Sequence, residues 1–198
     1  TLRFDPGWNQ YREGTNEKEM NMAAIFAPSD RAVVRYFANE SGKELVRRYG
    51  GNVPNTTTVE GLLQAIDSIP VDIVEAFVNN HMQVSFNGTV PSKFKYIMND
   101  ARNEMGVDVM DLKKTIMANN GVVYVMDTVY SPAEYVSVVA PIKLGDSLRI
   151  FNQFIEDEGY KTYLLSMDND FTVVVTADDY MVYYDPYSEI KGKNDTKD

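Results

Sequence analysis

One side chain of this sequence could act as a general base near neutral pH, and it belongs to the single histidine, His81. Metal sites built on several histidines or on thiolates are excluded, because the chain has one histidine and no cysteine. His81 follows an apolar helical pattern and precedes an alternating one. We therefore expect no catalytic residue, and we expect His81 to have a structural role where a helix meets a strand.

Acidic residues near the C-terminus are the candidates for a calcium site. They are Asp168 and Asp170, which flank Asn169, and the pair Asp178 and Asp179. A twelve-residue calcium loop also needs a central glycine and a final glutamate, and neither stands at the required position. We expect solvated turn residues here, with no bound metal and no cofactor.

Aromatic residues near the C-terminus could bind sugars, since aromatic faces pack on the apolar faces of pyranose rings. The stretch "YMVYYDPY" (180–187) is dense in tyrosine, and one tryptophan lies near the other end of the chain. Core or interface packing is the other common role of such residues. The possible interaction surface comprises Tyr180, Tyr183, Tyr184, Tyr187 and Trp8.

Composition limits the partners of this chain. Its 198 residues carry a formal net charge of -10, which opposes nucleic-acid binding because that needs clustered Lys and Arg. Hydrophobic residues make up 44% of the chain, enough for a substantial core. No stretch approaches the roughly 20 apolar residues of a membrane helix. We expect no membrane-spanning segment within this sequence.

The first half of the chain predicts one strand followed by helices. A short buried strand is expected at 23–27, and Ser29 or Asp30 can cap the helix after it. Thr57 and Glu60 have capping-box spacing before a helix whose buried face would carry Leu62, Leu63, Ile66 and Ile69. Pro70 suits the first turn of a further helix that ends near His81. The glycines at 42, 50 and 51 are expected in turns.

Beyond His81 the pattern alternates between strands and helices. Alternation predicts a strand over 82–86. Ser92 can cap a helix over 93–105 that Gly106 ends, and Asp108 can cap another over 109–120. The stretch "NGVVYVMDTVYSP" (120–132) is apolar at nearly every strand position, so we expect a central strand covered on both faces.

Two of these stretches resemble the signature boxes of the fasciclin domain. "AAIFAPSDRAV" (23–33) is similar to the first box, a strand entering a helix, and "NGVVYVMDTVYSP" is similar to the second. His81 matches the family's histidine, but Asn80 stands where a tyrosine often precedes it, so an integrin-type role is not expected. The resemblance implies an α+β, β-rich fold, a folded β-wedge of two sheets with a layer of helices. The matching structural positions are Phe26, Pro28, Asp30, His81, Asn120, Gly121, Asp127 and Pro132.

A second signal is internal similarity. "FTVVVTADDYMVYYDP" (171–186) resembles the first box again, with Val174 and Asp178 each 148 residues beyond Phe26 and Asp30 (174 − 26 and 178 − 30). A fixed period indicates a tandem array. We expect residues 1–141 to form a fasciclin domain without its usual leading helices, and 142–198 to begin a second repeat, with Asp146 capping its first helix. Residues 146–185 either pack where the leading helices would lie, within the chain or swapped with a neighbour, or form a separate domain.

Two functions from different classes follow. The resemblance implies a non-enzymatic adhesion or scaffold module of a secreted or cell-surface protein that binds a protein partner, with domain-swapped or tandem self-association as a further expectation. The alternative is a glycan-binding accessory protein of the bacterial cell surface. In either case we expect an extracellular location, with a lipid anchor on an N-terminal segment that precedes this sequence.

Overall fold

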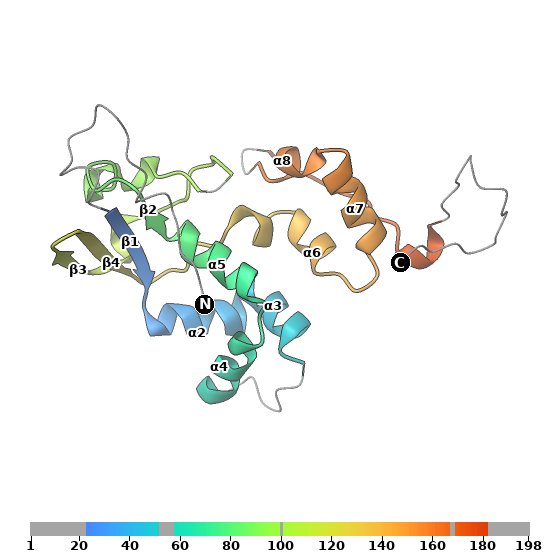
Figure 1. The fold of residues 1–198 in the computed structure, drawn as a ribbon, viewed down its shortest axis with the longest axis horizontal. Helices are drawn as coiled ribbons and strands as arrows, with labels where there is room; N and C mark the ends of the chain where they lie inside the picture. Colours follow the sequence, from blue (N-terminus) through green and yellow to red (C-terminus); the bar gives the residue numbers. More distant parts are fainter. Residues whose placement is uncertain (1–22, 52–57, 100, 167–168, 182–198) are drawn as a thin grey trace. The chain divides into compact units, whose positions relative to one another are not determined.

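The chain divides into two compact units, Thr1–Tyr135 and Val136–Asp198, whose elements are drawn in Figure 1. The computed structural model describes residues 23–51, 58–99, 101–166 and 169–181. The sequence placed the domain boundary between residues 141 and 142. The packing of residues 146–185 on the first repeat stays a prediction.

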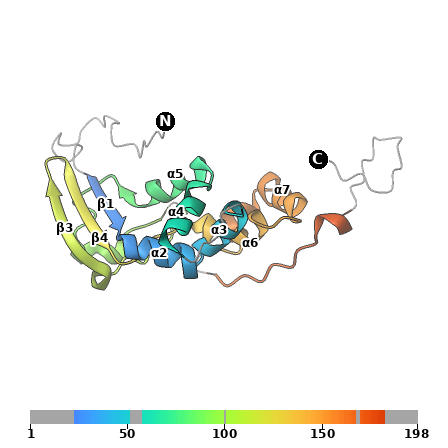
Figure 2. The same cartoon turned by 90° about the horizontal axis from the view of Figure 1, so that it is seen from below.

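A four-stranded mixed sheet organises the first unit, in the order β2-β1-β4-β3. Its strands are β1 (Ala23–Pro28), β2 (Met82–Gln83), β3 (Leu112–Ala118) and β4 (Gly121–Met126). Strand β1 runs parallel to β4, and the other two pairings are antiparallel. Figure 2 shows β1, β4 and β3 side by side. The predicted α+β class is confirmed, whereas the folded β-wedge of two sheets stays a prediction.

The two stretches that resemble the signature boxes lie next to each other in this sheet. Phe26 is opposite Tyr124 and Ala27 is opposite Val125, with the parallel register kept over six residue pairs. Strand β4 is central, as predicted, because it lies between β1 and β3. Phe26 and Val125 therefore lie on neighbouring strands of one sheet.

One face of the sheet carries the core of this unit. Phe26 is completely buried, and its ring stacks on Tyr124 with 5.2 Å between ring centroids and meets Phe94 edge-on at 5.3 Å. Val122 and Met126 bury the rest of the same face of β4. The opposite face of β4 differs, because Val123 and Val125 are partly exposed. The prediction that both faces are covered is thus right for one face and incomplete for the other.

Helices follow β1 in the order α2 (Asp30–Asn39), α3 (Gly42–Tyr49), α4 (Val59–Asp67) and α5 (Val71–Asn80). Ser29 caps α2, since its Oγ accepts a hydrogen bond from the Ala32 amide at 3.2 Å. Asp30 is the first helical residue, where its negative charge interacts favourably with the positive end of the helix dipole. Pro70 directly precedes α5, as its fixed φ allows.

Three details of the helical region differ from the predictions. The observed cap of α4 is Thr58, which accepts a hydrogen bond from the Gly61 amide at 3.1 Å, whereas Thr57 lies outside the described residues. Leu63 is 49% exposed, and Ala65 is buried in its place. Gly42 begins helix α3 instead of forming a turn. A larger residue would not fit at this position, because its side chain would collide with the buried ring of Tyr36.

The predicted helix over 93–105 is wrong. A 3₁₀ helix, η1 (Pro91–Tyr96), occupies its start, and Met98 and Glu104 then form an isolated antiparallel bridge. The side chain of Asn99 accepts hydrogen bonds from the amides of Ala101 and Asn103, which turns the chain away from helical geometry. The local hydrogen bonds of an asparagine thus override the helical spacing.

The predicted helix over 109–120 is also wrong. Asp108 does act as a cap, since its Oδ1 accepts from the Met110 amide at 2.8 Å, but the capped element is the short 3₁₀ helix η2 (Val109–Asp111). Strand β3 follows it and pairs with β4, so tertiary pairing decides the conformation. The strand expected over 82–86 is shorter than predicted and ends at Gln83. The 3₁₀ helix η3 (Ala133–Tyr135) closes this unit.

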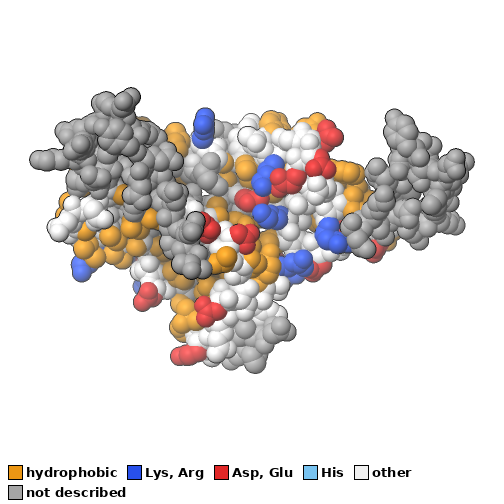
Figure 3. Space-filling model, in the orientation of Figure 1, with side chains coloured by type: hydrophobic (Ala, Val, Ile, Leu, Met, Phe, Trp, Pro, Cys, Tyr) orange, Lys and Arg blue, Asp and Glu red, His pale blue; other side chains and the backbone are white. Residues whose placement is uncertain are grey.

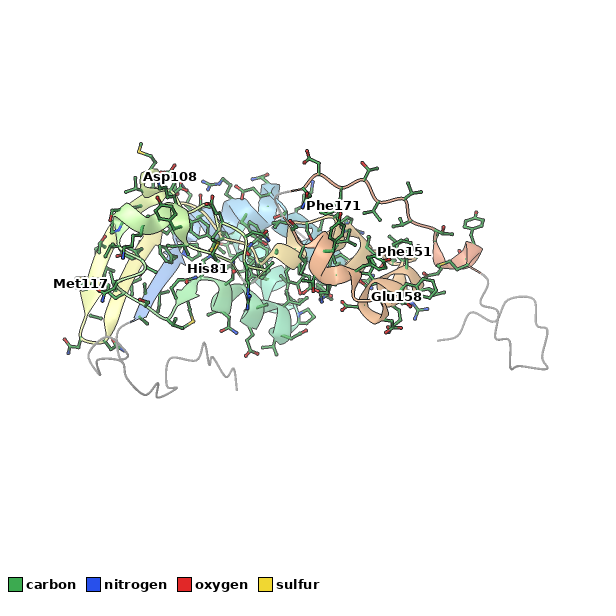
Figure 4. The ribbon with its side chains drawn as sticks, turned by 90° about the horizontal axis from the view of Figure 1, so that it is seen from above. His81, Asp108, Met117, Phe151, Glu158 and Phe171 are labelled. Carbon is green, nitrogen blue, oxygen red and sulfur yellow. The ribbon has the colours of Figure 1, made fainter. Side chains whose placement is uncertain are left out.

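The second unit contains α6 (Val139–Lys143), α7 (Arg149–Asp157), α8 (Tyr160–Leu164) and the 3₁₀ helix η4 (Asp178–Tyr180). Asp146 does not cap α7 as predicted. Instead, the carboxylate of Asp178 accepts hydrogen bonds from the amides of Arg149 and Ile150, each at 3.1 Å. Residues 171–177 are extended between α8 and η4. The ring of Phe171, labelled in Figure 4, meets the ring of Tyr163 edge-on, with 5.0 Å between the ring centroids.

Candidate functional site

His81 joins the end of α5 to the chain after β4. Its Nδ1 lies 2.7 Å from the Phe77 carbonyl oxygen, and its Nε2 accepts a hydrogen bond from the Tyr130 amide at 3.0 Å. The neighbouring Asn80 donates from Nδ2 to the Tyr130 carbonyl at 2.9 Å. His81 and Asn80 therefore hold both backbone polar groups of Tyr130, a residue that is itself buried.

This hydrogen-bond pattern defines the charge state of His81. Because Nε2 accepts, the proton of the neutral ring is on Nδ1, from which it is donated to Phe77. Burial lowers the pKa of His81 below its usual value, an effect that the hydrogen bond to Phe77 only partly opposes. Both nitrogens are used within the fold. The arrangement gives His81 the structural role predicted from its position, with neither nitrogen available to a substrate.

Asp127 lies at the end of β4 among three cations. Its Oδ2 is 2.9 Å from Arg31 Nη2 and 3.2 Å from Lys113 Nζ, while Arg35 donates to its backbone carbonyl. The hydrogen bonds from Lys113 and Arg31 lower the pKa of the Asp127 carboxyl. The cluster links α2 and β3 to β4. Because neighbouring cations compensate its charge, Asp127 has a structural role in linking these elements.

The other positions shared with the fasciclin boxes have packing roles. A side chain at Gly121 would come within 2.2 Å of the Ala23 carbonyl oxygen, so glycine allows β1 and β4 to meet. Asn120 is exposed, and its carbonyl accepts from the Ala23 amide at 3.1 Å. Pro28 is opposite Met126 at the far end of the same pairing, and Pro132 is fully buried.

The second face of the sheet carries an apolar row that reaches solvent. The strand registers place Met82, Ile25, Val123 and Ile116 side by side across all four strands. The first three are partly exposed, and Ile116 is 42% exposed on the edge strand β3. We call these four residues the open row. Figure 3 shows hydrophobic side chains gathered over the strands.

Strand β3 also exposes apolar residues outside the open row, since Met117 pairs with Val122 and therefore lies on the opposite face of the sheet from Ile116. Met117 is 59% exposed and Met110, just before the strand, is 80% exposed; Met117 is labelled at the outer side of the sheet in Figure 4. Within the described part of the chain, β3 pairs with β4 alone, so its outer backbone edge is unpaired. An exposed apolar edge of this kind is typical of an interaction surface.

Only one of the aromatic candidates falls within the described residues. Tyr180 is 81% exposed, whereas Tyr183, Tyr184, Tyr187 and Trp8 lie outside the described residues. Val174 and Phe26, which the internal similarity places at matching positions, have different environments. Val174 is 87% exposed, whereas Phe26 is buried.

The acidic candidates are explained without a metal as far as they are described. Asp178 accepts the amides of helix α7, Asp170 and Asp179 are exposed, and Asp168 lies outside the described residues. Across 23–51, 58–99, 101–166 and 169–181, no three His, Asp or Glu side chains come together as metal ligands would. Within the same ranges, no helix has the length and apolar character needed to span a membrane.

Comparisons with known proteins do not identify a relative. A scan against protein-family models finds no match, and searches of curated proteins and of solved structures find none either. The open row and the exposed edge of β3 were not among the residues singled out from the sequence. The alternation from Gly121 to Met126 indicated a strand, but which positions stay uncovered depends on where the helices pack.

Proposed function

We propose that this chain is a non-enzymatic adhesion or scaffold module of the fasciclin type, located at the cell surface or outside the cell. The observation that carries the proposal is the exposed edge strand β3, which presents Ile116 of the open row on one face of the sheet and Met117 on the other. Apolar residues that remain exposed in a group on a folded domain mark a protein-binding face. The function requires a binding surface and no catalytic step.

The pairing of the two box-like stretches supports the fasciclin assignment. The resemblance implies that the first and second boxes share one sheet, and β1 and β4 are hydrogen-bonded neighbours. His81, which matches the family's histidine, also supports the fasciclin assignment. It connects helix α5, through Phe77, to Tyr130 after β4. Export and lipid anchoring belong to the same proposal and are tested by locating the protein in its own cells.

Strand β3 suits a protein partner in two respects. The unpaired backbone edge can accept a further strand, and side chains on the two faces of that strand can cover Ile116 on one face and Met117 on the other. Lys113 and Lys114 on the same strand favour a partner with acidic residues at its contact edge. Lys113 already contacts Asp127, which leaves Lys114 as the main positive charge of this edge.

The test compares two single substitutions at positions of equal exposure. Met117 on β3 and Val71 on α5 are each 59% exposed, so Met117→Glu and Val71→Glu carry the same charge change at the same accessibility. Binding of the fluorescently labelled chain to intact cells of its source organism is measured by flow cytometry. We expect Met117→Glu to weaken saturable binding at least tenfold and Val71→Glu to leave it unchanged.

The outcome also separates a protein partner from a glycan. Protease treatment of the target cells should abolish binding, whereas periodate oxidation of their sugars should not. Absence of saturable binding, or equal loss in both variants, would contradict the proposed face. Matching melting curves of the two variants show that any loss is not caused by unfolding.

The glycan alternative is favoured by one observation, the 81% exposure of Tyr180. An aromatic ring this accessible can stack on a sugar. In that case Tyr180→Ala should abolish retention on a glycan affinity gel, while Tyr160→Ala, at a ring that is 60% exposed, should not. Periodate treatment of the cells would then remove binding and protease treatment would not.

A further inference from the structure

The first unit contains an apolar pocket of about 350 Å³, open to solvent, on the helical side of the sheet. Its walls come from β1, from β2 and from helices α2 to α5. Ile25 forms part of the sheet side, and Phe37, Ile66, Val74 and Phe77 belong to the helices. Because β1 has its other face packed in the core, the pocket lies between the sheet and the helices that cover it.

The pocket is larger than a packing defect. Protein interiors hold few voids bigger than a water molecule, whereas small-molecule sites begin at about 300 Å³. It also has access to solvent, since the lining residues Ile25, Val33 and Val74 are partly exposed. A ligand could therefore enter without the domain unfolding.

The lining offers no free hydrogen-bonding side chain. Among the described residues that line the pocket, His81 alone has a polar side chain, and both of its ring nitrogens are engaged, with Phe77 and with Tyr130. A polar group buried in this pocket would lose its hydrogen bonds to water without replacement, which is unfavourable. A hydrocarbon group would lose none, and it would gain the hydrophobic free energy of burial.

We infer that this pocket binds the alkyl chain of a free single-chain lipid, such as a fatty acid, whose polar head stays in solvent. The volume accommodates one chain and not the two chains of a bilayer phospholipid, so the source is a monomeric lipid. The pocket shares Ile25 and Met82 with the open row, but Met117 on the edge strand β3 is not among its lining residues. Met117→Glu, which should disrupt the proposed protein-binding face, should leave lipid binding unchanged, so the two proposals can fail separately.

Binding is tested with saturated fatty acids of increasing length on the delipidated chain, below the concentration at which they form micelles. Each methylene that enters the pocket should tighten binding about fourfold, as expected for its removal from water. We expect saturable one-to-one binding by calorimetry, an affinity that rises from octanoate to dodecanoate, and a plateau when the pocket is full. Vesicles of a two-chain phospholipid should not compete.

A matched pair of variants on α5 locates the site. Val74 lines the pocket, whereas Val71, one turn earlier on the same helix, does not and is 59% exposed. Val74→Phe should fill part of the pocket and weaken dodecanoate binding at least tenfold, while Val71→Phe should leave it unchanged. Melting curves of both variants establish that they are folded.

A measurement on the unaltered chain keeps the test independent of variant folding. With methionine methyl groups labelled for NMR, dodecanoate should shift the resonance of Met82, which lines the pocket, and not that of Met117 on the outer strand. Absence of saturable binding, affinity that does not depend on chain length, or shifts at Met117 without shifts at Met82 would each overturn the inference. The same holds if Val71→Phe weakens binding as much as Val74→Phe does.

Discussion

Substitution of His81 by glutamine tests whether this histidine stabilises the fold in its neutral form. In the native protein the Tyr130 amide donates to Nε2 and Nδ1 lies against the Phe77 carbonyl, so protonation of Nε2 removes an acceptor. Glutamine can still accept from the Tyr130 amide but does not titrate. Because the chain has a single histidine, this variant removes all imidazole titration.

The direction and size of the effect follow from linkage. Burial lowers the pKa of His81 in the folded state, so the unfolded chain binds more protons once the pH falls below about 6.5. The free energy of unfolding therefore decreases as the pH falls, by at most about 1.4 kcal/mol per pH unit for one group. Between pH 6.5 and pH 5.0 the loss attributable to His81 is at most about 2 kcal/mol.

The assay is urea unfolding of both proteins at pH 7.5 and pH 5.0, followed by tyrosine circular dichroism. We expect the natural protein to lose up to about 2 kcal/mol more stability between these two values than His81→Gln does. His81→Leu serves as the companion variant at pH 7.5, where the orphaned buried amide of Tyr130 should cost about 1–3 kcal/mol. The titration of carboxylates is common to the natural protein and to His81→Gln, so it cancels in this comparison.

Equal pH dependence in the natural protein and in His81→Gln would refute this reasoning. It would mean that His81 has the same proton affinity in the folded and unfolded states. The buried hydrogen bonds on both ring nitrogens would then be absent in solution.

Three further substitutions test the packing. Gly121→Ala should destabilise the fold by more than about 2 kcal/mol, since the new Cβ would lie 2.2 Å from a backbone oxygen, whereas Gly51→Ala, with open space around it, should change the urea midpoint little. Asp178→Ala should cost about 1 kcal/mol and speed amide exchange at the start of α7, while Asp179→Ala, at an exposed neighbour, should do neither. Phe26→Ala should cost about 3–5 kcal/mol in urea unfolding, and a loss below 1 kcal/mol would show that the aromatic cluster is not the centre of the core.

Local sequence features were sufficient where short-range physics fixes the structure. A short buried strand at 23–27 and a cap at Ser29 or Asp30 were predicted, and the structure has a strand at Ala23–Pro28 and Ser29 as the cap. Such features are predictable because a run of apolar residues and an N-cap side chain act within a few residues. The central position of β4 followed from its almost continuous apolar character. The structural role of His81 was expected from its place between a helix and a strand.

Long-range contacts decided the rest. Residues 112–118 have a composition compatible with helix, and pairing with β4 makes them a strand. Helix α7 is capped by Asp178, 29 residues from Arg149, so no local pattern near Asp146 could reveal it. The open row and the apolar pocket exist because four strands in register and several helices leave part of one sheet face uncovered. Sequence patterning determines which residues are apolar, but only the tertiary arrangement determines which of them remain accessible to a partner.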